Sequence, residues 1–85
     1  MTVSPSDPAP VVVDGRNLEP PEPFEQTMEA LERLAPGQKV RLLIGREPFP
    51  LYRALELNGF SWHTGRTPDG DVEVLIWRRA EHPMK

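Results

Sequence analysis

The sequence of 85 residues contains no cysteine. Without a thiol, the chain forms no disulfide, offers no thiolate nucleophile and builds no zinc site with cysteine ligands. It also has no apolar run close to the ~20 residues that a transmembrane helix needs. Residues 1–10 carry neither the basic residue nor the long apolar core that a secretory signal requires. We therefore expect a soluble, cytoplasmic protein with no membrane partner.

The sequence also lacks an excess of positive charge, and it has few histidines. Ten basic residues are interspersed with 13 acidic ones, which gives a net charge of −3. Because proteins that bind polyanions usually carry a basic stripe, we do not expect nucleic acid among the partners. His63 and His82 do not have the spacing of paired metal ligands. We expect no metal site and no cofactor.

Proline, in contrast, is abundant, with 11 residues. Residues 1–10 contain Pro5, Pro8 and Pro10 but few apolar side chains, so they cannot bury enough surface to offset the entropy of ordering. We predict a disordered, proline-rich arm at residues 1–10. We also predict a flexible tail at residues 80–85, where proline cannot continue a strand ladder. A single small domain remains at residues 11–79.

Hydrophobic periodicity divides this domain into six elements. The pattern predicts, in chain order, a strand at 11–13, a helix at 23–34, a strand at 39–44, a helix at 50–58 and strands at 60–67 and 72–79. Two helices are enough to cover only one face of a four-stranded sheet. The predicted fold is therefore an α/β (α+β) two-layer sandwich of order βαβαββ, with a four-stranded mixed sheet and two helices on one face.

The last two strands are predicted to form a hairpin. Residues 67–71 read Thr-Pro-Asp-Gly-Asp, in which proline suits the second position of a type I turn and glycine the left-handed position after it. A three-residue loop would pair Thr67 with Asp71 and would set Trp62 opposite Ile76. Because side chains alternate between the two faces of a strand, this register places the apolar residues of 72–76 on the helix side.

The same register leaves three apolar side chains on the face away from the helices: Leu43, Leu75 and Trp77. An apolar patch of this kind marks an interaction surface, and tryptophan is enriched at binding hot spots. The leading hypothesis is thus a noncatalytic protein-interaction module that docks an unknown protein partner through its open sheet face. Two alternatives stay open: the patch is covered by the arm or the tail, or it forms a homodimer interface.

Two arginines suggest another function. Arg16 and Arg46 each follow a strand of the predicted parallel pair, at the carboxyl edge where open α/β sheets bind ligands. Together they would hold a carboxylate or phosphate, which makes a small-anion or ligand-binding sensor the alternative function. The prolines near both helix starts remove N–H donors that a phosphate needs. Simple pairing of the two arginines with Glu19, Glu22 and Glu47 is the competing interpretation.

Nothing in the sequence predicts catalysis. Four glutamates recur at helical spacing and are most simply a solvated helix face: Glu22, Glu25, Glu29 and Glu32. A catalytic carboxylate pair needs a desolvated cleft, and no pattern here indicates one. We therefore expect no catalytic residues and no enzyme activity.

The stretch from Val13 to Pro23 resembles the opening of the TusA/SirA-like sulfur carriers, whose pattern is Asp, a few residues, Leu, any residue, Cys, Pro, any residue, Pro. The resemblance covers residues 11–79 and implies the same βαβαββ order. In those relatives the cysteine carries a persulfide, and Pro20 stands at that position here. Direct sulfur carriage is thus excluded.

The chain is more similar still to a cysteine-less sister family described only as a domain of unknown function. The stretches that carry this similarity are residues 18–23, 46–52 and 74–78. Some relatives in the broader group occur beside hemerythrin-like and nitrogen-oxide respiration proteins. The resemblance therefore implies a further alternative, an accessory role in sulfur or redox metabolism, with nitrogen-oxide metabolism included.

Overall fold

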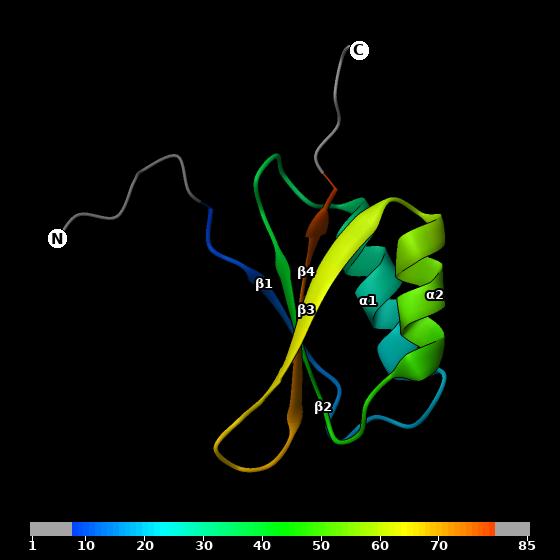
Figure 1. Cartoon of the computed structure of the whole chain (residues 1–85), viewed down its shortest axis with the longest axis vertical. Coiled ribbons are helices and arrows are strands. Elements are labelled where there is room, and N and C mark those ends of the chain that lie inside the picture. The colour runs from blue at the N-terminus through cyan, green and yellow to red at the C-terminus, as the bar shows by residue number, and fades with distance from the viewer. Residues whose placement is uncertain (1–7, 80–85) are drawn as a thin grey trace, which may run out of the picture.

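The computed structural model describes residues 8–79; the predicted tail and most of the predicted arm lie outside the described residues. The elements are β1 (Val11–Asp14), α1 (Glu22–Glu32), β2 (Val40–Ile44), α2 (Phe49–Leu57), β3 (Phe60–Arg66) and β4 (Val72–Arg78) (Figure 1). The predicted βαβαββ order is confirmed. Element ends differ slightly, since α1 ends at Glu32 and not at Leu34.

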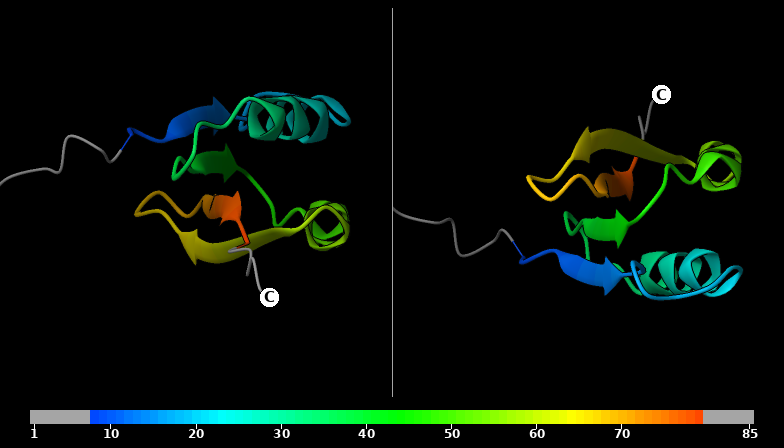
Figure 2. Two further views of the ribbon diagram at one scale, coloured as in Figure 1. Left: turned by 90° about the horizontal axis from the view of Figure 1, so that it is seen from above. Right: turned by 90° about the horizontal axis from the view of Figure 1, so that it is seen from below.

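The four strands form one mixed sheet in the order β1-β2-β4-β3. β1 and β2 are parallel, and β4 runs antiparallel to both β2 and β3. Figure 2 shows both helices on the same side of the sheet, with α1 beside β1 and α2 beside β3. The other side of the sheet carries no second layer from residues 8–79, so the predicted two-layer sandwich is confirmed.

The core lies between the sheet and the two helices. On the sheet side it consists of alternating residues of β2 and β4 that are almost fully buried: Val40, Leu42, Val72, Val74 and Ile76. Leu31 of α1 and Leu51 and Leu55 of α2 cover them. Each such side chain contributes about 1.5–3 kcal/mol through burial. Among residues 8–79, Thr27 is the one buried polar residue, and its Oγ1 donates a hydrogen bond to the Pro23 carbonyl at 2.7 Å.

The predicted hairpin register is confirmed. The Thr67 N–H donates to the Asp71 carbonyl at 2.9 Å, and Gly70 has φ +89° in the turn. Trp62 then faces Ile76 across the pair. Because this register is fixed by the turn, Leu75 and Trp77 point to the face away from the helices, as expected from the alternation of side chains.

Candidate functional site

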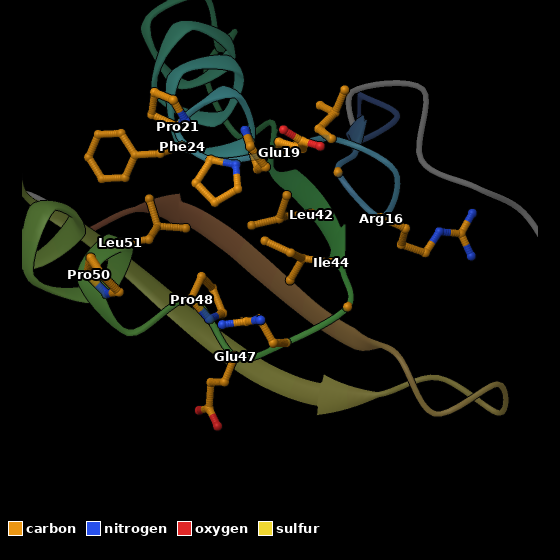
Figure 3. A pocket seen from close by; sticks show the side chains of 16 residues that line it. Arg16, Glu19, Pro21, Phe24, Leu42, Ile44, Glu47, Pro48, Pro50 and Leu51 are labelled. Carbon is orange, nitrogen blue, oxygen red and sulfur yellow. The ribbon is translucent and has the colours of Figure 1, made fainter.

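An open cavity of about 760 Å³ lies at the carboxyl ends of β1 and β2, between the first turns of the two helices (Figure 3). Leu42 and Ile44 of β2 form its floor. The remaining residues that line it are Gly15, Arg16, Leu18, Glu19, Pro20, Pro21, Pro23, Phe24, Gly45, Arg46, Glu47, Pro48, Pro50 and Leu51. We call this cavity the proline groove because five of these residues are prolines.

The prolines make the two walls of the groove poor in hydrogen-bond donors. A proline in the first helical turn removes a backbone N–H, and its ring fixes φ near the helical value. Several of the remaining backbone N–H groups near the helix starts donate hydrogen bonds to carbonyl groups of the same chain. The pairs, donor first, are Glu22 and Glu19 (2.9 Å), Glu25 and Pro21 (3.0 Å), Phe49 and Glu47 (3.1 Å), and Leu51 and Pro48 (3.0 Å). The groove therefore presents mainly apolar surface to a ligand.

Gly15 lets the connection after β1 pack closely enough to form a wall. Its N–H donates to the Leu43 carbonyl at 2.7 Å. A Cβ atom at this position would lie 3.1 Å from the Cβ of Pro23 and 3.4 Å from the Leu43 carbonyl oxygen. Glycine at position 15 therefore allows Pro23, at the start of α1, to pack close to Leu43 of β2.

Arg16 lines the groove, but its guanidinium is bound elsewhere. Its Nε and Nη2 donate to the two carboxylate oxygens of Asp14 at 2.9 and 2.8 Å, and its Nη1 lies 3.5 Å from Asp71 Oδ2. These hydrogen bonds lower the pKa of Asp14 from 3.8 to about 2. Figure 3 shows the Arg16 guanidinium pointing away from Leu42 and Ile44. The pairing with acids expected as an alternative thus occurs, with two aspartates in place of the glutamates.

Arg46 lines the same groove and is exposed. Among residues 8–79, no carboxylate oxygen lies within 4.0 Å of its guanidinium nitrogens. The neighbouring Glu47 accepts a hydrogen bond from the Tyr52 hydroxyl at 3.1 Å. The structure therefore brings both predicted arginines to one groove, and within residues 8–79 Arg46 is the one of the two that has no carboxylate partner.

Tyr52 anchors the α2 wall of the groove, a role that the sequence did not reveal. Its ring stacks on Trp62 of β3 with centroids 5.3 Å apart, and its hydroxyl lies 2.7 Å from Thr64 Oγ1. Burial raises the pKa of Tyr52 above 10.0. Because these contacts tie the first turn of α2 to β3, they hold Leu51 and the adjoining prolines in place. The signal available in the sequence was the predicted placement of Trp62 on the helix side.

The open sheet face differs from its prediction in one residue. Leu75 and Trp77 are partly exposed, as expected, but Leu43 is only 9% exposed. Leu43 pairs in the sheet with Asp14 of β1 and Glu73 of β4, whose side chains lie on the same face of the sheet. We therefore correct the predicted patch to Leu75 and Trp77.

Charged groups are paired across this face. Arg41 forms an ion pair with Glu73, and the Lys39 ammonium lies 5.2 Å from the centre of the Trp77 ring. Such cation–π contacts contribute about 0.5–1 kcal/mol at exposed positions. The open face is thus a mixture of apolar and paired charged side chains.

Two kinds of feature are absent from the part of the chain that the structure describes. Residues 8–79 contain no group of three or more His, Asp or Glu side chains arranged to hold a metal ion. Neither α1 nor α2 is long and apolar enough to cross a membrane.

Comparisons with known proteins found one family and one solved structure that are similar to this chain. Residues 12–78 match the model of a family described as "Uncharacterized conserved protein (DUF2249)". The crystal structure of a SirA-like protein from Desulfitobacterium hafniense superposes with a TM-score of 0.69 at 22% sequence identity, over 78% of this chain and 93% of that chain. That likeness shows a common fold and confirms the predicted resemblance. No curated protein matches the sequence.

Proposed function

The chain belongs to the DUF2249 family, and we propose that it is a noncatalytic binding module whose proline groove takes a small, largely apolar ligand. The observation that carries this proposal is the groove itself. Its volume of about 760 Å³ falls in the range of roughly 300–1,000 Å³ typical of small-molecule sites. Its lining combines apolar side chains with few free polar groups, which is also typical of such sites.

The chemistry of the lining supports a binding role over a catalytic one. The ionisable groups in the groove are two arginines and two glutamates, and none is a nucleophile paired with a base. Pro20 stands where the resemblance to sulfur carriers places their persulfide cysteine. A prolyl ring adds apolar surface there and cannot carry sulfur, because a persulfide needs a thiolate. An accessory role in sulfur or redox metabolism stays a prediction.

A neutral fluorescent probe tests the groove. N-phenyl-1-naphthylamine is apolar and uncharged, and we expect it to bind the wild-type chain saturably with a ratio of one to one. Phe24 lines the groove and is 38% exposed, so Phe24→Ala should weaken probe binding about tenfold through lost apolar contact.

Phe49 provides the matched control. It also lies in the first turn of a helix and is 67% exposed, but it does not line the groove. Phe49→Ala should leave probe affinity within a factor of two of the wild type. Equal losses in both variants, or no saturable binding by the wild type, would contradict the proposed function.

The open sheet face supports a second candidate function, association with a second copy of the chain. Trp77 and Leu75 lie on the inner strand β4, where a partner would cover them completely. Lys39 and Arg41 occupy the end of the face where β2 begins, and Asp14 lies at the end where β1 finishes. Because Arg41 pairs with Glu73 and Asp14 with Arg16 within the chain, a second copy turned by 180° would be held mainly by apolar contact between the two Leu75 and Trp77 patches.

A further inference from the structure

The proline groove contains two arginines but one available guanidinium. Arg16 donates two hydrogen bonds to Asp14 and also pairs with Asp71, so a ligand anion would have to displace carboxylates to reach it. Arg46 has no carboxylate within 4.0 Å among residues 8–79. A guanidinium left free beside an apolar cavity is suited to hold an anionic group of a ligand.

The surroundings of Arg46 limit the charge of that ligand. Glu19 and Glu47 also line the groove, so one free positive charge stands near two carboxylates. Figure 3 shows the Glu47 side chain pointing away from Leu42 and Ile44, where it accepts the hydrogen bond from Tyr52. A ligand with several negative charges, such as a phosphate ester, would meet repulsion from these carboxylates. It would also find few backbone donors at the helix starts.

The apolar side chains of the groove determine what chemistry the rest of the ligand needs. Figure 3 shows the Leu42 and Ile44 side chains pointing toward Phe24 of α1 and Leu51 of α2, which lie near each other across the cavity. None of these four side chains offers a hydrogen bond. Leu42 and Leu51 are only 1% and 2% exposed, so the apolar area left for a ligand to bury belongs to Ile44, Phe24 and the exposed proline rings.

We propose that the ligand is an amphipathic monoanion, a small organic acid whose apolar body lies on Ile44 and Phe24 while its acid group meets the Arg46 guanidinium. This inference rests on the proposed function, since it names the class of ligand for the same groove. It assigns different roles to the two arginines: Arg46 binds the ligand, and Arg16 holds the β1 end of the wall.

A matched pair of probes separates charge from apolar contact. 8-Anilinonaphthalene-1-sulfonate has the aromatic body of N-phenyl-1-naphthylamine plus one sulfonate. We expect the sulfonate probe to bind more tightly to the wild type at physiological salt. Arg46→Gln should weaken the sulfonate probe about three- to tenfold and leave the neutral probe within a factor of two. Arg46→Lys should restore part of the lost affinity.

Arg53→Gln is the control of the same residue type away from the groove, because Arg53 is exposed on α2 and does not line the cavity. It should change the affinity of the sulfonate probe less than twofold. Arg16→Gln should weaken the sulfonate probe less than Arg46→Gln does, because the Arg16 guanidinium is engaged by Asp14. Decanoate should displace the sulfonate probe from the wild type better than decanol does, and this difference should shrink in Arg46→Gln.

The outcomes distinguish the two proposals. If both probes bind equally and Arg46→Gln changes neither, the ligand-class inference is wrong while the binding role stands. If Arg16→Gln weakens the sulfonate probe as much as Arg46→Gln does, the assignment of roles to the arginines is wrong. If neither probe binds saturably, the proposed function itself fails.

Discussion

The two sides of the sheet differ in whether their charged side chains are paired within the chain. On the open face, charged groups are paired within the chain: Arg41 with Glu73, and Lys39 over the ring of Trp77. In the proline groove, Arg46 has no carboxylate partner within 4.0 Å among residues 8–79, and Ile44 and Phe24 keep exposed apolar surface. The comparison indicates that a ligand finds an unpaired charge and exposed apolar surface in the groove. A face with matched charges favours a large complementary surface, while a groove with one free cation favours a small molecule.

The largest expected effect is the loss of folding stability when a leucine on the helix side of the sheet is truncated, compared with one on the open face. Leu42 is 1% exposed and belongs both to the core and to the groove floor. Leu42→Ala should lower the free energy of unfolding by about 2–5 kcal/mol through cavity formation. A domain of this size has only ~3–5 kcal/mol in total, so the variant should be partly unfolded without denaturant.

Leu75→Ala is the matched change on the open face. Leu75 is partly exposed, so its truncation should reduce stability by about 1 kcal/mol or less. Urea unfolding followed by tryptophan fluorescence measures both variants. Similar losses for the two would mean that the open face is as tightly packed as the core.

The next effect concerns association through the open face. If a second copy docks there, Trp77→Glu should raise the dissociation constant of the dimer about thirtyfold, the effect of removing a hot spot of ~2 kcal/mol. Sedimentation velocity over a range of protein concentrations measures the change. Phe49→Glu is the control, because it adds the same charge at an exposed aromatic position elsewhere. A wild type that stays monomeric at high concentration would remove this second candidate.

The smallest expected effect is a change in the pKa of Asp14, which distinguishes Arg16 from Arg46. The hydrogen bonds from Arg16 hold the pKa of Asp14 at about 2, below 3.8. Because the folded-state pKa of Asp14 is lowered, the stability that it contributes is present above its unfolded pKa of ~3.9 and is lost as pH falls through about 2. In Arg16→Gln, the pKa of Asp14 should return towards 3.8.

Arg46→Gln should leave the pKa of Asp14 near 2, since Arg46 does not contact it. Carboxylate titration by nuclear magnetic resonance measures both variants. A shift of the Asp14 pKa in Arg46→Gln as large as that in Arg16→Gln would show that the two guanidinium groups are not independent.

The sequence predicted the fold well because its signals were local. The Thr67–Asp71 turn determines the β3–β4 register through glycine and proline chemistry within five consecutive residues. Gly59, with φ +83°, likewise stands directly after the helix predicted at residues 50–58, where a left-handed residue commonly follows a helix. Signals of this kind need no knowledge of distant contacts.

The site was less predictable because it depends on residues far apart in the chain. Arg16 meets Asp71 because the β2–β4 pairing brings the start of β4 near the end of β1, which no local pattern reveals. Phe24 has the helical spacing of a core residue, yet it is 38% exposed and lines the groove. Leu43 alternates as predicted and has strand neighbours on both sides, in β1 and β4, yet its 9% exposure could not be read from the alternation alone.

The most direct test of the account is to map the binding of N-phenyl-1-naphthylamine on the ¹H–¹⁵N spectrum of the chain, which at 9.6 kDa is well suited to the method. We predict that the amide signals of Phe24, Gly45 and Arg46 shift on titration, while those of Leu75 and Trp77 stay in place. Shifts confined to Leu75 and Trp77 would contradict the central claim and would move the binding site to the open sheet face.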